Sequence, residues 1–347
     1  MSTDNHIKEV YLQNFGLIKD FYCDSFAGVN VILGENSTGK TFLLKALYSP
    51  LKSAEEKNTG AENRSYAEIL AQKLYWTFQV DKIGDIVTKS SDGPLNCDIK
   101  FDTDAEVRYQ FSQKAERKIQ NCEAINIPSD ITTIFIPARE VLSIFDAITE
   151  SREYRKEFGF DDTYYDLVKI LRIQPQRGKN FKTFSDMKQL LKEVVNGKVE
   201  YDSKRQKWIY KRGNQKYSIG ATSDGIKKIS VLDHLLSNHY LGKGSILFID
   251  EVESGLHPSA LVQLIDILRE LSLQMGIQVF ISTHSYFVIK KLVLDATTGN
   301  KISSTCISLH TDGTYEVSDL SDGMPDNSII DESIRLYEAQ VDGIMGD

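Results

Sequence analysis

Residues Gly34–Thr41 read GENSTGKT, which matches the pattern G-x-x-x-x-G-K-[ST]. An apolar run, VNVILG, leads into this stretch, and a helical run, FLLKALYSPL, follows it. Gly34 and Gly39 permit backbone angles that turn consecutive N–H groups towards phosphate oxygens, and the N-terminus of the following helix favours an anion. The stretch therefore predicts an α/β fold of the P-loop NTPase kind, with a phosphate-binding loop between a strand and a helix.

Two side chains of the loop have expected roles. Lys40 is expected to neutralise the β- and γ-phosphates of a nucleoside triphosphate, and Thr41 to ligate Mg²⁺. Contacts to the nucleotide are expected along the whole loop and at the residue after it, namely at Gly34, Glu35, Asn36, Ser37, Thr38, Gly39, Lys40, Thr41 and Phe42. The alternative is a glycine turn that carries Lys-Thr by coincidence, which the order of strand, loop and helix disfavours.

A second motif, SILFIDE, is an apolar strand that ends in two carboxylates. An aspartate at a strand end beside a phosphate loop can hold magnesium, and a following glutamate can polarise the attacking water. We assign Asp250 to the metal and Glu251 to the general base. Taken alone, the pattern also fits a solvated strand terminus.

The sequence downstream of Glu251 favours the catalytic interpretation. EVESGLHPSAL places Gly255, His257 and Pro258 just before a helix, and a second buried strand then ends in Ser-Thr-His-Ser. The imidazole of His284 in that segment is a candidate for contacting the γ-phosphate and sensing its presence. A structural histidine is the alternative.

The rest of the sequence suggests four segments. Residues 1–80 carry two strands, the phosphate loop and two helical runs, with the polar break SAEEKNTGAENR between the helices. Residues 81–139 hold three alternating runs, CDIKFD, VRYQFS and TTIFIP, typical of antiparallel strands flanking the main sheet. Residues 140–220 read as an inserted helical lobe and a short strand meander. Residues 221–347 alternate helix and strand, which indicates a parallel sheet with crossover helices.

Composition limits the function classes. With 41 basic and 49 acidic side chains the net charge is -8, which argues against a surface that wraps nucleic acid but leaves local basic patches open. No apolar run is long enough for a membrane span, and the first residues lack a signal-peptide pattern, so we expect a cytoplasmic protein without a membrane partner. The widely spaced cysteines are expected to be reduced structural thiols, namely Cys23, Cys97, Cys122 and Cys306.

Four motifs in order, GENSTGKT, ATSDGIKKIS, ILFIDEVESGLHP and ISTHS, resemble the ATP-binding domain shared by the RecF, SMC and OLD (overcoming lysogenization defect) ATPases. This is an ABC-type domain with a mixed sheet, often labelled AAA. The resemblance covers both ends of the chain and is weak in the middle. It implies ATP and Mg²⁺ as cofactors, hydrolysis of ATP to ADP and phosphate, and a homodimer or higher homo-oligomer that sandwiches two ATP molecules.

The resemblance also assigns a signature helix. Ser223 and Gly225 fall where this family caps the γ-phosphate bound by a second subunit, and a helix N-terminus there favours an anion. Asp224 departs from the glycine of transporter-type members, and a simple capped helix start is the alternative. The segment IPARE matches the place of the glutamine-containing loop but has no glutamine. Either Arg139 or Glu140 takes over the coupling to the lobe, or the segment is an ordinary helix start.

The resemblance leaves the biological role open among several classes. About sixty residues follow His284, too few for the Toprim nuclease of OLD proteins, so we expect a separately encoded effector, a nuclease or toxin, as in anti-phage defence systems. A RecF-like repair ATPase acting on DNA is the main alternative. A transporter energy subunit and a nucleotide-gated scaffold with negligible turnover are two further possibilities.

Overall fold

The computed structural model describes residues 5–60, 63–175, 182–298 and 303–345. The phosphate loop emerges from a six-stranded sheet of order β14-β13-β3-β12-β11-β7, parallel except for β14, which is antiparallel to β13. Its strands are β3 (Val29–Gly34), β7 (Thr133–Ile136), β11 (Ile246–Ile249), β12 (Gln278–Ser282), β13 (Ser304–Leu309) and β14 (Tyr315–Asp319). Every residue of the five parallel strands is buried, because helices or a second sheet cover both faces. The predicted mixed α/β fold is confirmed.

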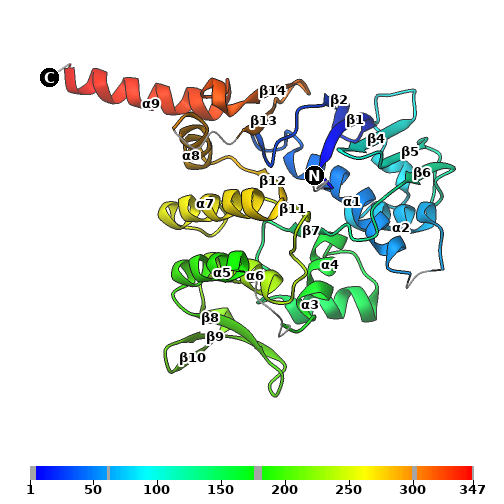
Figure 1. The fold of residues 1–347 in the computed structure, drawn as a ribbon. Helices are drawn as coiled ribbons and strands as arrows, with labels where there is room; N and C mark the ends of the chain where they lie inside the picture. The colour runs from blue at the N-terminus through cyan, green and yellow to red at the C-terminus, as the bar shows by residue number, and fades with distance from the viewer. Residues whose placement is uncertain (1–4, 61–62, 176–181, 299–302, 346–347) are drawn as a thin grey trace.

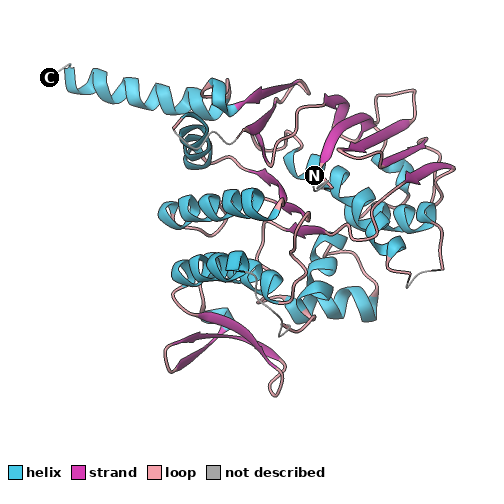
Figure 2. Ribbon diagram, viewed as in Figure 1, coloured by secondary structure: helices cyan, strands magenta, loops and turns pink. Residues whose placement is uncertain are grey.

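The two faces of this sheet pack against different cores. Val31 and Leu33 of β3 point into one core, whereas Ile32 points into the other, as the two-residue period of a strand requires. Figures 1 and 2 show the helices of the first core on one side of the strands and the antiparallel sheet on the other. The helices of the first side are α5 (Lys182–Val195), α6 (Asp224–Ser237), α7 (Pro258–Met275) and α8 (Tyr286–Thr297).

The second core lies between the main sheet, two helices and a five-stranded antiparallel sheet of order β2-β1-β4-β5-β6. Helices α1 (Lys40–Asn58) and α2 (Tyr66–Phe78) cross this space. The strands are β1 (Ile7–Phe15), β2 (Ile18–Cys23), β4 (Leu95–Phe101), β5 (Glu106–Phe111) and β6 (Asn121–Ile125). Antiparallel flanking strands are thus present, with β4 and β5 where CDIKFD and VRYQFS predicted them, whereas β2 and β6 were not predicted.

Two expectations for the first 139 residues are wrong. TTIFIP does not join the antiparallel flank: it forms β7, which is fully buried and pairs in parallel with β11. The polar break after α1 starts later than expected, because α1 continues to Asn58. Two polar residues near the end of α1 are buried and hydrogen-bonded: Ser53 Oγ donates to Ser49 O at 2.8 Å, and the Glu55 carboxylate accepts from Thr133 N–H at 2.8 Å.

In its described residues the lobe contains three helices, a π-helical turn and a three-stranded meander. No helix starts at Glu140, contrary to the expectation for IPARE: its carboxylate accepts from Ser143 N–H at 3.0 Å and closes a turn instead. The helical parts are α3 (Phe145–Thr149), the π turn Glu150–Arg155, α4 (Asp162–Leu171) and α5. The meander predicted from its alternating pattern is present as β8 (Lys198–Asp202), β9 (Lys207–Arg212) and β10 (Gln215–Ser218).

The remaining elements are three short 3₁₀ turns and a C-terminal helix. The turns span Ile83–Ile86, Ile219–Ala221 and Leu320–Asp322. Helix α9 (Ser328–Met345) extends away from the rest of the chain (Figure 1). Among the described residues, no helix combines the length and apolarity that crossing a membrane requires. The four cysteines are free thiols, three of them buried, and burial raises the pKa of Cys306 to about 11 and that of Cys122 to about 12.

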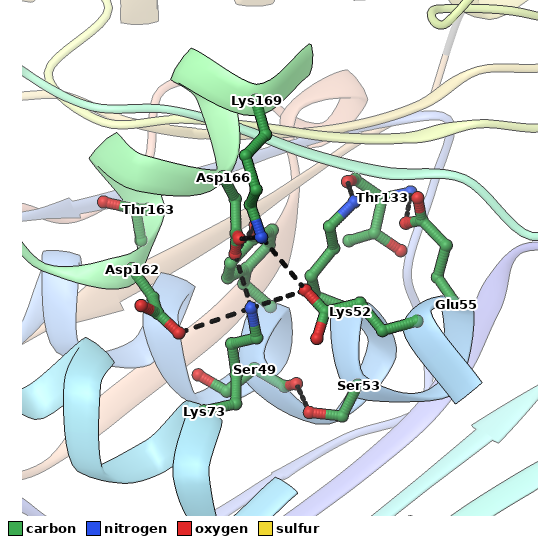
Figure 3. Close-up of polar contacts among 12 residues, drawn as sticks. Ser49, Lys52, Ser53, Glu55, Lys73, Thr133, Asp162, Thr163, Asp166 and Lys169 are labelled. Atoms are coloured by element: carbon green, nitrogen blue, oxygen red, sulfur yellow. Dashed lines mark hydrogen bonds and ion pairs between the residues drawn. The ribbon is translucent and has the colours of Figure 1, made fainter. Parts of the chain in front are cut away.

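A buried ionic cluster joins α1, α2 and α4. Lys73 of α2 lies 2.7 Å from Glu56 of α1, 2.7 Å from Asp166 and 3.3 Å from Asp162, both on α4 (Figure 3). Burial by itself lowers the pKa of Lys73, but Asp166, Asp162 and Glu56 hold it well above its usual range. Burial also raises the pKa of Asp162 to about 6, against the pull of Lys73. The cluster ties the helix that begins in the phosphate loop to the helical lobe.

Candidate nucleotide site

The phosphate loop has the backbone that its glycines predict. Gly34 has φ 147° and Gly39 has φ 101°, the region that side chains rarely adopt. A Cβ on Gly34 would stand 2.5 Å from Leu309 O and 2.6 Å from Thr38 Oγ1, so no side chain fits there. Thr38 Oγ1 closes the loop by donating to Glu35 O at 2.9 Å. The compact conformation of this loop therefore leads directly into the first turn of α1, which begins at Lys40.

Lys40 lies across the loop that precedes it. Its Nζ donates to Gly34 O and to Glu35 O, both at 2.7 Å, and the side chain is buried. Burial lowers the pKa of Lys40, while the nearby carboxylates of Glu251 and Asp250 oppose that shift. The ammonium is thus held inside the loop, where phosphate oxygens would bind.

Asp250 and Thr41 meet at the end of β11. Thr41 Oγ1 donates to both carboxylate oxygens of Asp250 at 2.9 Å, and Ser282 Oγ at the end of β12 donates to Asp250 Oδ1 at 2.6 Å. The carboxyl ends of β11 and β12 thus bring Asp250 and Ser282 together with Thr41 in the first turn of α1. Hydroxyl and carboxylate oxygens are the ligands that Mg²⁺ prefers, so the donor set fits the expected metal.

Glu251 follows in an unusual backbone conformation. Its φ is 43°, and its N–H donates to Ser282 Oγ at 2.8 Å. Lys228 of α6 donates from Nζ to Asp250 O at 3.2 Å and to Glu251 O at 2.5 Å. Burial lowers the pKa of Lys228 to about 8, against the opposing effect of Glu253, Asp250 and Glu251. Neither Lys228 nor Ser282 was singled out from the sequence.

His284 is held by a residue that the sequence analysis passed over. Glu253 accepts from His284 N–H at 2.8 Å and lies 3.0 Å from its Nδ1, and it also accepts from Thr283 Oγ1 at 2.7 Å. The imidazole remains about half exposed, at 51%. Glu253 stands two residues after Glu251 in DEVES. This second carboxylate close to the proposed general base was the feature of the sequence that could have pointed to it.

A pocket of about 400 Å³ opens beside the loop. Six of the predicted contact residues line it, namely Asn36, Ser37, Gly39, Lys40, Thr41 and Phe42, together with Glu251. The ring of Phe42 packs on Phe15 and Phe78 at 5.5 and 4.7 Å between centroids. Gly34, Glu35, Thr38, Asp250 and His284 are not among its described lining residues: the first three shape the loop, and Asp250 lies behind Thr41.

Known proteins resemble this chain in sequence. A family model described as "AAA domain, putative AbiEii toxin, Type IV TA system" matches residues 29–290, more than half of the chain. The chain belongs to this AAA family. A protein of Helicobacter pylori (strain ATCC 700392 / 26695) named ATP/GTP phosphatase is 23% identical over 328 residues, which cover 82% of this chain and 87% of that protein.

One of two similar solved structures supports the fold. The SMC head bound to the C-terminal winged-helix domain of ScpA matches with a TM-score of 0.53 at 14% identity, covering 90% of this chain and 97% of that one. A RecF–ATP structure matches with a TM-score of 0.47 at 14% identity, covering 91% and 98%. The SMC head supports the ABC-type fold that the motifs suggested, and the family match together with the Helicobacter pylori relative identifies this AAA-family chain as an ATPase.

The segment expected to be the signature lies at the start of α6. Ser223 is the N-cap, and its Oγ accepts from Ile226 N–H at 3.4 Å, so the segment forms the capped helix start that the sequence left open as the alternative. A Cβ on Gly225 would stand 2.6 Å from Gly255 O, which places the signature against the loop after β11. Neither Ser223 nor Gly225 is among the described residues lining the pocket of its own chain.

IPARE is linked to the signature helix through Glu140. Lys227 lies 3.4 Å from Glu140 and 2.9 Å from Asp224. The negative charge of Asp224, which departs from transporter-type members, is thus paired within the helix. The lobe reaches the pocket through a different residue, Asp161, which lines it, caps α4 and binds Lys45 of α1 at 2.7 Å.

Asp161→Asn is expected to tighten ATP binding about five- to tenfold, because it removes a negative charge from the pocket that receives the phosphates. Asparagine preserves the cap of α4, so the fold is retained. Titration of a fluorescent ATP analogue measures the change, with Asp202→Asn at the half-buried end of β8 in the meander as the control. Equal ATP affinities for the two variants would show that the charge of Asp161 does not act on the phosphates.

Proposed function

We propose that this chain is an ATP-driven switch in which two copies sandwich two ATP molecules and hydrolysis reopens the pair. One observation carries the proposal: Lys40, Thr41 and Glu251 converge on one pocket, whereas Ser223 and Gly225 lie at a helix N-terminus that does not line it. A helix N-terminus that begins with a serine favours an anion. A second copy of the chain supplies the γ-phosphate that this terminus fits.

Hydrolysis follows from the side chains around the pocket. Lys40 and the N–H groups of the loop bind the phosphates, and Glu251 accepts the proton of the attacking water. Thr41 and Asp250 would hold Mg²⁺, which when bound neutralises the charge that develops on the phosphates. His284, positioned by Glu253, contacts the γ-phosphate and releases that contact when phosphate departs.

The output of the switch is proposed to be a separately encoded effector, a nuclease or toxin, in anti-phage defence. The family description, which names a toxin and a toxin–antitoxin system, supports this role. The helical lobe is the proposed transmitter, since Asp161 at the pocket and the buried cluster around Lys73 connect α4 to α1. RecF-like action on DNA is the second candidate, favoured by the motif order shared with RecF.

A mixed-subunit experiment tests the sandwich. Lys40→Met removes the phosphate lysine, and Ser223→Asp places a carboxylate at the signature while preserving the N-cap of α6. Each variant alone is expected to be inactive, but an equimolar mixture forms composite sites from one intact loop and one intact signature and recovers up to about a quarter of wild-type turnover. A mixture as inactive as its components would contradict the sandwich.

Two assays separate the effector role in defence from the repair role on DNA. Purified chain is assayed with DNA ends or gapped DNA over a series of salt concentrations, and phage plaque formation is measured in cells that carry the chain with and without its neighbouring gene. Protection that requires both genes and Glu251 supports the effector role. A DNA-stimulated rate that falls steeply with salt supports the repair role instead.

A further inference from the structure

Lys228 of α6 is a buried cation whose ammonium lies beside the end of β11. It is 4% exposed, and within the described part of the chain its Nζ donates to the backbone oxygens of Asp250 and Glu251. Moving an ammonium from water into the protein interior costs free energy unless hydrogen bonds and nearby charges compensate for the lost hydration. Those contacts fall on the two peptide units that carry the proposed metal ligand and the proposed general base.

The backbone of Glu251 needs such support. A glutamate with φ 43° occupies a conformation that persists only where its surroundings enforce it. Ser282 Oγ accepts from the N–H of Glu251 at 2.8 Å on one side, and Lys228 donates to its carbonyl at 2.5 Å on the other. The residue is therefore held at both ends of its backbone, from β12 and from α6.

We propose that Lys228 is a positioning residue: it fixes Glu251 in its left-handed backbone conformation and thereby aims the carboxylate at the attacking water. The proposal rests on the proposed function, in which Glu251 is the general base. Lys228 acts through the backbone carbonyl of Glu251.

This placement has a consequence for the dimer. Lys228 lies on the same helix as Ser223 and Gly225, whose N-terminal turn faces the partner's γ-phosphate in the sandwich. Gly225 also packs directly against Gly255, in the loop that follows Glu251. Helix α6 thus contacts the Asp250–Gly255 segment at two points. Lys228 therefore links the helix that carries the proposed signature to the segment that carries the proposed general base.

The test compares Lys228→Met with Lys228→Arg. Methionine keeps the length and apolar stem of the side chain but donates no hydrogen bond, whereas arginine still donates to two carbonyls. Lys228→Met is expected to lower the single-turnover rate of ATP hydrolysis about 100-fold, the effect of misplacing a reactive group by about an ångström, with ATP affinity within about twofold of wild type. Lys228→Arg is expected to recover most of the lost rate.

Matched measurements separate this role from a purely structural one. Lys291→Met removes a half-buried lysine from α8, away from the pocket, and is expected to keep the wild-type rate. Circular dichroism melting is recorded for every variant. Loss of ATP affinity together with rate in Lys228→Met, or no recovery in a folded Lys228→Arg, would overturn the proposal. If Lys228→Met does not fold, Lys228→Arg decides alone: a rate near wild type supports positioning by donated hydrogen bonds, and an inactive, folded protein refutes it.

The failure of this proposal is distinguishable from that of the proposed function. Normal hydrolysis by Glu251→Gln would remove the general base and the proposed function with it. Normal hydrolysis by Lys228→Met, in a series where Glu251→Gln is inactive, removes only the positioning role.

Discussion

Glu251→Gln is expected to lower the single-turnover rate of ATP hydrolysis by about 10²- to 10⁴-fold while ATP still binds. The amide is nearly isosteric with the carboxylate but cannot accept the proton of the attacking water. Backbone contacts of residue 251 to Ser282 and Lys228 do not depend on the side chain, so the site keeps its shape. Because hydrolysis reopens the dimer in the proposed mechanism, the variant is also expected to accumulate as a closed, ATP-bound dimer.

Quench-flow measurement of ADP formation and light scattering after size exclusion with ATP follow the two effects. Glu316→Gln on β14, a glutamate in the edge strand far along the sheet from β11, serves as the control and keeps both turnover and the monomer–dimer balance of wild type. Unchanged turnover in Glu251→Gln would refute the assignment of the general base. Lost turnover without a trapped dimer would keep the base and refute the sandwich.

Lys73→Met is expected to lower the free energy of unfolding by about 3–5 kcal/mol near neutral pH. Lys73 is 4% exposed and faces three carboxylates, so its removal leaves Glu56, Asp162 and Asp166 close together in a buried site (Figure 3). Burial by itself raises the pKa of Asp166, but Lys169, Lys73 and Lys52 hold it well below its usual range. Chemical denaturation followed by circular dichroism measures the loss.

The size of this loss depends on pH in a defined direction. The pKa of Asp162, about 6 in the folded protein, lies above its usual value, so protonation stabilises the fold and that contribution is lost as pH rises through about 6. Without Lys73 the charged form of Asp162 is less favoured still. The destabilisation by Lys73→Met is therefore expected to be smaller at pH 5.5 than at pH 7.5.

Lys169→Met is the matched control for the buried cluster. Lys169 also binds Asp166, at 2.6 Å, but its side chain is 42% exposed, so water screens the pair. Its removal is expected to lower the free energy of unfolding by less than about 1 kcal/mol. Equal losses for the two variants would show that burial of Lys73 does not determine the stability of the cluster.

Local rules predicted the parts of the site that lie within one stretch of chain. The positive φ of Gly34 and Gly39, the helix that starts at Lys40 and the cap at Ser223 each depend on a few neighbouring residues. The predictions failed where burial overrides local pattern. The polar residues at the end of α1 stay helical because their side chains find buried partners, and β7 joins the parallel sheet because both its faces are covered.

The phosphate loop with which the sequence analysis began illustrates the division. GENSTGKT by itself determined a loop wound to receive phosphates, because glycine backbone freedom and helix geometry are local properties. Only the tertiary structure brought Asp161 to Lys45 across 116 residues, Ser282 to Asp250 and Lys228 to Glu251. Those pairs depend on strand order and helix packing, which bring residues distant in sequence within hydrogen-bonding distance. No spacing in the sequence encodes them directly.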